Sequence, residues 1–249
     1  MRHRIVLRAV ASSLQALALI GGALVPHAFA QFWTKQPYEN WSRQDCSKML
    51  SDSPWAKSYT VGRVFIQRMY EDAEVPGRDQ TPQITYVVRL LSAPPIRQAM
   101  VRMARLEPNY AKLTPEQKQE LDAHHKSLVE SAYPGRVVIQ IQYTTNALAY
   151  RAELPTRWQA QAEEVLKQQI FLITPRGRIP AARVFVGAGA GGDIQLIFPR
   201  TVEGRAVLEP NDKSLSLEFR HPTVGVLTAE RVFVEFKVKN MVVNNELLY

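Results

Sequence analysis

The sequence predicts an α+β fold: an N-terminal helical segment, then mixed helices and strands, then an antiparallel β-rich C-terminal sheet or small sandwich. Three observations lead to this expectation. Helix-capping patterns and helical stripes of apolar residues occur between residues 42 and 166. Strand-like segments dominate after residue 182. Turn-forming residues separate the segments from one another.

Residues 1–30 are predicted to be a secretory signal peptide. The basic start contains three arginines and no acid, and an apolar run follows from Ala9 to Val25. Ala28-Phe29-Ala30 is a small-x-small cleavage site, which makes Gln31 the expected new N-terminus. The alternative is an uncleaved membrane anchor, but the run is short for a membrane span. We therefore expect an exported protein, in the periplasm or outside the cell, cleaved after Ala30.

The mature chain, 31–249, is expected to divide into three parts. These are a tryptophan-rich helical segment (31–57), an α+β region (58–175) and a β-rich region (176–249); one domain spanning 31–249 is the alternative. A single cysteine excludes an intramolecular disulfide. Loss of three arginines with the signal peptide lowers the formal charge from +8 to +5. No basic block or nucleic-acid motif accompanies this charge, so we expect no nucleic-acid partner. The mature chain has no second apolar segment long enough to span a bilayer.

A short helix is expected between Ser42 and Pro54. Ser42 is a favourable N-cap, and Asp45 occupies the acidic position of a capping box. Trp41 stands where a hydrophobic staple begins. The apolar stripe of this helix consists of Cys46, Met49 and Leu50. Pro54 ends the helix because the residue before a proline is disfavoured in the α region.

Further elements follow in order. We expect strands at 59–67 and 84–91, a loop at 71–83, a helix at 96–106 opened by Pro94-Pro95, a helix from Thr114 to 132, and a strand at 137–143. Thr156 and Gln159 repeat the capping-box spacing and predict another helix, with Trp158 and Leu166 in its stripe. Short strands are expected at 170–173, 182–188, 193–198, 214–219 and 231–238.

The tryptophan-rich segment is the first candidate site. It holds three of the four tryptophans, and two interpretations of it stay open. The aromatic side chains either pack the segment onto the main body or present a stacking surface for a sugar or a peptide. Large aromatic residues are mostly buried, so packing is favoured. If the segment does bind a ligand, we expect the contacts to come from Tyr38, Trp41 and Trp55.

Catalytic chemistry is sparse in the sequence. Cys46 is expected to be a small buried hydrophobe, and the alternative is a nucleophile paired with a histidine. His124 and His125 are adjacent on a helix and point about 100° apart, so they are poor partners for one metal ion. One should pack against the core and the other should face water, while His221 precedes a proline in a turn. We expect no metal and no cofactor.

The glycine-rich stretch from Gly187 to Asp193 imitates a nucleotide-binding loop. Such a loop needs a helix after it, so that backbone amides face the phosphate. Here a strand-like run, 194–198, follows. A hairpin loop in which glycines supply positive φ angles is the favoured interpretation.

Three motifs together resemble a known family. They are Cys46 followed by Ser53-Pro54-Trp55-Ala56, then Phe198-Pro199-Arg200 at a strand end, and the tail that begins at Phe236. They are similar to an uncharacterised family of exported proteins from soil-type bacteria, which carry a tryptophan-rich segment after the signal peptide. The resemblance covers most of the mature chain and implies export and a shared fold. The family has no established activity, so no functional residue is carried over.

The expected function is that of an exported, non-enzymatic binding or structural protein of the bacterial cell envelope. Its partner would be another envelope protein or a glycan. The alternative is an envelope hydrolase that uses dispersed carboxylates or Cys46. A third hypothesis is a subunit of a larger assembly, joined through the edges of the C-terminal strands.

Overall fold

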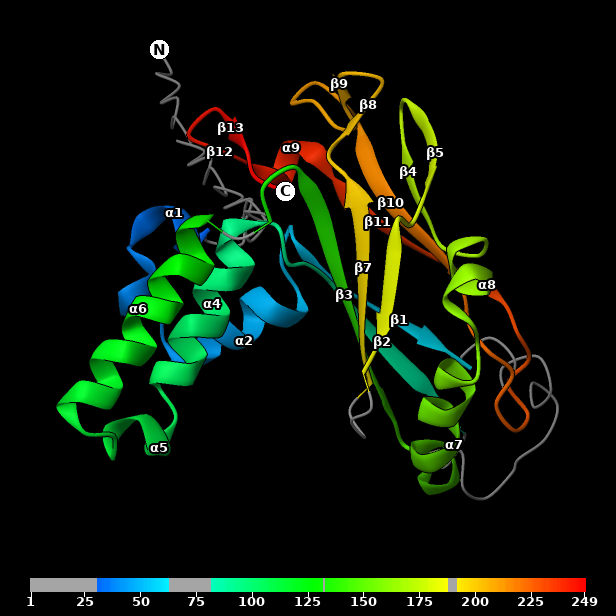
Figure 1. The fold of residues 1–249 in the computed structure, drawn as a ribbon, viewed down its shortest axis with the longest axis horizontal. Helices are drawn as coiled ribbons and strands as arrows, with labels where there is room; N and C mark the ends of the chain where they lie inside the picture. The colour runs from blue at the N-terminus through cyan, green and yellow to red at the C-terminus, as the bar shows by residue number, and fades with distance from the viewer. Residues whose placement is uncertain (1–30, 63–81, 132, 188–191) are drawn as a thin grey trace, which may run out of the picture. The chain divides into compact units, whose positions relative to one another are not determined.

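The computed structural model describes residues 31–62, 82–131, 133–187 and 192–249. The predicted signal peptide and most of the predicted 71–83 loop lie outside these residues. Phe32–Tyr249 forms one compact unit. It combines a group of helices with antiparallel sheets, which confirms the α+β prediction (Figure 1).

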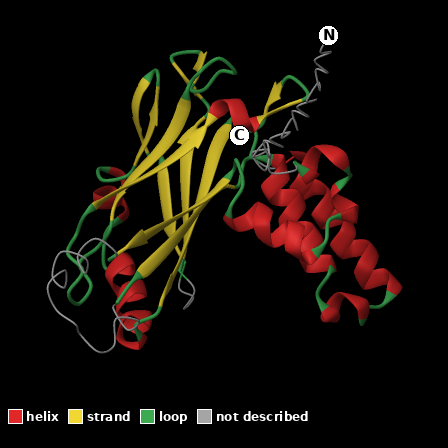
Figure 2. Ribbon diagram, turned by 180° about the vertical axis from the view of Figure 1, so that it is seen from behind, coloured by secondary structure: helices red, strands yellow, loops and turns green. Residues whose placement is uncertain are grey.

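A group of helices forms a layer at one side of the strands (Figures 1 and 2). They are α1 (Phe32–Lys35), η1 (Tyr38–Asn40), α2 (Arg43–Ser51), α4 (Pro94–Arg105), α5 (Pro108–Ala111) and α6 (Pro115–Ser131). We call this group the helical layer. Helix α4 is central to it, since it packs against both α2 and α6. Its first two residues are prolines, which the first turn tolerates because its amides have no intrahelical partner.

The predicted N-terminal caps of α2 and α6 are confirmed. In α2 the Asp45 amide donates to Ser42 Oγ at 3.1 Å, and the Ser42 amide donates to Asp45 Oδ2 at 3.0 Å. In α6 the Thr114 amide donates to Gln117 Oε1 at 3.0 Å, and the Gln117 amide donates to Thr114 Oγ1 at 3.3 Å. Each pair satisfies two amides that a helix start leaves unpaired.

The larger sheet, sheet A, is antiparallel. In spatial order its strands are β1 (Ala56–Val61), β2 (Ile84–Leu90), β3 (Arg136–Thr145), β7 (Asp193–Pro199) and β6 (Arg183–Val186). Alternate residues of β2 and β7 are buried, as expected of strands with one face on a core. The outer edge of β6 lies against a helix, where Glu163 accepts the Val184 amide at 3.0 Å. That edge is therefore covered.

The smaller sheet, sheet B, is also antiparallel. Its strands are β11 (Arg231–Lys237), β10 (Ser214–Arg220), β4 (Phe171–Thr174) and β5 (Gly177–Pro180). The inner faces of the two sheets meet, and the rings of Tyr86 and Phe219 lie 5.2 Å apart in an edge-to-face contact. The later strands form all of sheet B and two strands of sheet A, which confirms the predicted antiparallel, β-rich C-terminal region, and the two sheets pack as a sandwich.

Helices α7 (Leu148–Gln159) and α8 (Glu163–Lys167) lie beside the sandwich, α7 toward one end of it (Figure 1). Trp158 of α7 is fully buried, and its ring lies 6.2 Å from that of Phe219. Helix α7 thus contributes a large side chain to the shared core.

The remaining elements are short. They are β8 (Thr201–Val202), β9 (Arg205–Ala206), α9 (Val238–Met241), β12 (Val242–Val243) and β13 (Glu246–Leu247). The C-terminal segment reaches the tryptophan-rich segment, because Trp55 Nε1 donates to the carbonyl oxygen of Leu248 at 2.6 Å. The two ends of Phe32–Tyr249 are therefore tied together.

One predicted helix was wrong. Thr156 is not an N-cap but lies near the end of α7, where its hydroxyl donates to the Ala152 carbonyl at 3.2 Å. Tyr150, Leu154 and Trp158 form a buried stripe at i, i+4 and i+8, and this stripe places the helix earlier than the capping pattern suggested.

Other boundaries differ slightly. Strand β1 begins at Ala56 rather than at residue 59, and the rest of the predicted 59–67 strand lies outside the described residues. Sheet A joins strands from both sides of residue 175, so the chain on either side of that point shares one sheet.

Candidate functional site

Two of the three aromatic residues considered for ligand binding are buried. Trp41 is 1% exposed and Trp55 is fully buried, while Tyr38 is half-buried. Their rings pack edge to face with neighbours, as in the 5.7 Å contact between Trp33 and Trp55. The packing interpretation is confirmed for both tryptophans, and neither ring offers a face on which a sugar could stack.

The thiol of Cys46 is also buried in the core. Burial raises its pKa to about 11, and the charge of Arg102 only partly opposes this effect. A nucleophilic thiol needs a lowered pKa and access to substrate. The hypothesis of a Cys46 nucleophile is therefore inconsistent with the structure.

The three histidines that the structure describes lie in different settings. His125 is buried and His124 is exposed, as predicted for neighbours on one helix. His221 is fully buried in the sandwich, where Tyr86 Oη lies 2.6 Å from its Nδ1. Burial lowers the pKa of His221 to about 4. The His221 side chain is thus neutral at physiological pH and is part of the packed core of the sandwich.

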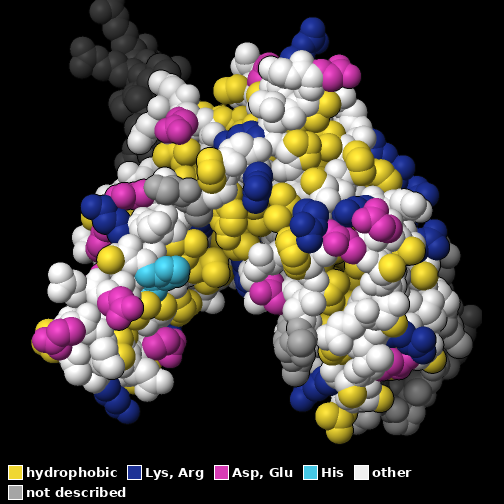
Figure 3. Space-filling view, in the orientation of Figure 1, with side chains coloured by type: hydrophobic (Ala, Val, Ile, Leu, Met, Phe, Trp, Pro, Cys, Tyr) yellow, Lys and Arg dark blue, Asp and Glu magenta, His cyan; other side chains and the backbone are white. Residues whose placement is uncertain are grey.

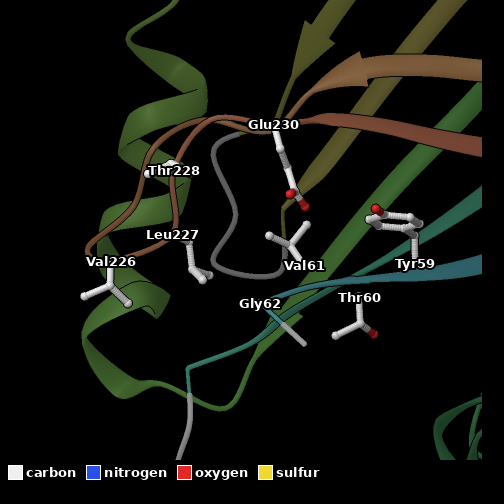
Figure 4. Close-up of a pocket in the computed structure, with 8 residues that line it drawn as sticks. All are labelled: Tyr59, Thr60, Val61, Gly62, Val226, Leu227, Thr228 and Glu230. Carbon is white, nitrogen blue, oxygen red and sulfur yellow. The ribbon is translucent and has the colours of Figure 1, made fainter. Parts of the chain in front are cut away.

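A small pocket opens between the end of β1 and the loop before β11 (Figure 4). Tyr59, Glu230 and two threonines supply its polar side chains, and its apolar walls come from Val61, Val226 and Leu227. Burial raises the pKa of Tyr59, and the charge of Glu230 adds to that effect. This lining offers one carboxylate and no convergent set of donors, so we assign no ligand to it.

Several charged side chains come together on the outer face of sheet B. Strand alternation buries one set of side chains in β10 and β11 and turns the other set outward. The register then brings distant residues together: Arg220 pairs with Arg231, and Glu218 lies between Phe171 and Phe233. Residues outside the core thus gather from four strands.

Two guanidinium groups contact one carboxylate on this face, and a third arginine lies in the same depression. Arg178 Nη2 lies 2.6 Å from Glu218 Oε1, and Arg231 Nη1 lies 3.6 Å from the same oxygen. Arg220 lines the same shallow depression. We call Arg178, Arg220, Arg231 and Glu218 the arginine cluster. The guanidinium of Arg178 stacks on Phe171, 3.6 Å from the ring centre, which fixes its orientation.

The guanidinium groups of the arginine cluster have more hydrogen-bond donors than Glu218 can accept from. Glu218 is 5% exposed and occupied by two arginines, whereas the side chains of Arg178 and Arg231 are 46% and 60% exposed. Three positive charges thus face one negative charge in the depression. The amides of Gln168 and Gln169 line its rim. Farther along the same face, Glu235 and Lys237 offset each other in charge. The arrangement can bind an anionic group with planar, bidentate hydrogen bonds.

Sequence reasoning missed these residues. The alternation in 214–220 and 231–237 places Glu218, Arg220 and Arg231 on the polar faces of their strands, and that signal was readable. The pairing of β5 with β4, which brings Arg178 to the same place, depends on a register that the sequence does not state.

Elsewhere, surface charge is mixed. Figure 3 shows one face on which basic and acidic side chains are interspersed, and hydrophobic side chains gather in the hollow between the helical layer and the strands. Within the described ranges, no group of three or more His, Cys, Asp or Glu could hold a metal ion. None of the helices there is both long and apolar enough to cross a membrane.

Comparisons with known proteins add no relative. No protein-family model matches the chain, and neither a curated protein nor a solved structure matches it. The functional argument therefore depends on the residues of this chain alone.

Proposed function

We propose that the protein is exported and acts in the bacterial cell envelope as a non-enzymatic binding protein for an acidic glycan. The basic start, the apolar run and the Ala28-Phe29-Ala30 sequence support export. One observation carries the binding proposal: three arginines line an exposed depression whose one carboxylate, Glu218, is already paired with two of them.

The chemistry of the depression favours a carboxylate-bearing sugar. Arginine matches a carboxylate with two parallel hydrogen bonds, and the glutamine amides can bind hydroxyl groups. Phe233 is 51% exposed and pairs with Glu218 across the strands, so its ring offers an apolar face beside the charges. A uronic acid presents the same combination of carboxylate, hydroxyls and apolar ring face.

The enzymatic alternative has less support. Its thiol version fails because Cys46 is buried with a raised pKa. In the arginine cluster the only acid is Glu218, and two arginines hold it. A general acid or base needs a carboxylate free to exchange protons with substrate. The arrangement suits binding better than hydrolysis.

A charge-matched pair of variants tests the site. The double variant R220Q/R231Q removes two charges from the arginine cluster, and R151Q/R205Q removes two from exposed positions on α7 and β9. Titration calorimetry with oligogalacturonate as probe, and a neutral oligosaccharide as control ligand, measures affinity at two salt concentrations. We expect the first variant to bind at least about tenfold more weakly and the second to change by less than about twofold.

Two results would overturn this assignment. Equal weakening in both variants would mean that bulk charge, rather than the arginine cluster, attracts the glycan. Absence of binding by the folded wild-type protein would remove the glycan proposal. Export is tested separately, by cell fractionation and by the mass of the mature protein, which should begin at Gln31.

A further inference from the structure

Two arginines outside the arginine cluster lie where the helical layer meets sheet A, in a pocket that shares no lining residue with the cluster. This pocket forms between the start of α4, the segment after α6, the end of β7 and the β12–β13 hairpin. Its polar lining consists of Ser92, Arg97, Tyr133, Arg200, Glu246 and Tyr249. We call it the junction pocket.

Arg97 is almost completely buried, with 4% of its surface exposed. Its Nη1 donates to the carbonyl oxygens of Leu91, at 3.0 Å, and Ser92, and its Nη2 donates to that of Val129 at 3.0 Å. Its Nε is buried and has no hydrogen-bond partner. The side chain thus carries a full charge into the protein with neutral carbonyls as its partners.

Arg200 stands beside it. Its Nη2 donates to the backbone oxygen of Tyr249, and its guanidinium lies 4.2 Å from the centre of that residue's ring. Its Nε is also buried and without a partner. Burial lowers the pKa of Arg97, the nearby Tyr133 raises it, and the charge of Arg200 lowers it again. The two arginines are therefore close enough to repel each other.

Among the residues that the structure describes, neither arginine forms an ion pair with Asp or Glu. Glu246 is the acid in the lining, and it is exposed. Burial of a charge is unfavourable unless an opposite charge and hydrogen bonds offset the lost hydration. Two adjacent guanidiniums with unused Nε–H donors can hold an oxyanion, since arginine presents its donors in a planar fork.

We propose that the junction pocket binds a phosphate group, either as the free ion or as part of a phosphorylated ligand, between Arg97 and Arg200. The inference does not depend on the acidic-glycan proposal, because the two sites share no residue. Both arginines donate to the phosphate oxygens, and Glu246 at the rim weakens binding by charge repulsion.

The test is titration calorimetry of the purified protein with inorganic phosphate at constant ionic strength, followed by glycerol 3-phosphate as a simple phosphate ester. We expect saturable binding with one site per chain. Arg200→Gln should weaken it at least about tenfold, and Glu246→Gln should strengthen it by about two- to threefold. Arg97→Lys keeps the charge near the carbonyls and should weaken binding without unfolding the protein.

The results with these variants distinguish phosphate binding in the junction pocket from binding elsewhere and from pairing of the arginines with the chain's own carboxylate. R220Q/R231Q should leave phosphate binding unchanged, so failure at one site is distinguishable from failure at the other. Equal binding by wild type and by Arg200→Gln, or no binding by either, would overturn the proposal. Where residue 249 carries a free carboxylate, that group competes for Arg200. Adding Gly-Ser after Tyr249 moves that carboxylate away from Arg200. If phosphate binds only to the extended protein, the two arginines normally pair with the carboxylate, and the proposal of an external ligand is overturned.

Discussion

His221 should make the stability of the protein depend on pH. Its ring is fully buried, Tyr86 bonds to one nitrogen, and the other nitrogen has no partner. Adding a proton would place a charge in the core of the sandwich. The folded state therefore resists protonation, and burial lowers the pKa of His221 from its usual 6.5 to about 4.

The magnitude follows from linkage. Between pH 6.5 and pH 4 the unfolded chain binds a proton at this residue and the folded chain does not, so stability falls as pH falls. Each pH unit across that window corresponds to about 1.4 kcal/mol, which gives a loss of about 3 kcal/mol in the free energy of unfolding by pH 4. Below pH 4 both states are protonated at His221, and this contribution changes no further.

Urea unfolding of wild type and His221→Gln at pH 7.5, 6, 5 and 4 measures the effect. Acidic groups also lose stabilising contacts on acidification, so the informative quantity is the difference between the two proteins. We expect that difference to shift by about 3 kcal/mol in favour of the variant from pH 7.5 to pH 4. His124→Gln is the matched control, because that ring is exposed and its removal should leave the curve unchanged. Parallel curves for wild type and His221→Gln would refute the reasoning.

Three further predictions concern the tryptophan-rich segment. Cys46 should resist a thiol reagent in the folded protein and react fully in urea, because its thiol is buried; rapid labelling under native conditions would contradict its placement. Trp55→Phe should lower the free energy of unfolding by about 1–3 kcal/mol, because it leaves the Leu248 carbonyl without its donor, and an unchanged urea midpoint would argue against that tie. Ser42→Ala should cost about 1 kcal/mol by removing the cap of α2, measured in the same way, while the exposed Ser47→Ala serves as control.

Much of the local structure could be predicted because it depends on neighbours in the sequence. The caps at Ser42 and Thr114 need only residues three positions away, and both are confirmed. The same rule failed at Thr156, because a Thr-x-x-Gln spacing also occurs by chance inside a helix. There the buried stripe of Tyr150, Leu154 and Trp158 determined the boundaries, since it buries far more apolar surface than one cap can offset.

Predicting the arginine cluster needed information that lies outside any local window. The polar faces of β10 and β11 could be read from alternation, but which strands meet across a sheet depends on long-range pairing. Strand β5 has four residues and was not expected, although it carries Arg178 to Glu218. Similarly, the buried location of Trp55 follows from contact with Leu248 near the other end of the chain.

The placement of the arginine cluster also has an energetic reason. A carboxylate as buried as Glu218 requires paired cations, and Arg178 and Arg231 supply them from strands on either side. Fixing a long arginine side chain in one conformation costs side-chain entropy. Stacking on Phe171 already restricts the conformations of Arg178, so little further entropy is lost when it binds a partner. Its remaining donors are thereby held ready for a ligand, and less entropy is lost on binding. Under the proposed function, Glu218 would favour ligands that bind the outward donors of these already ordered arginines.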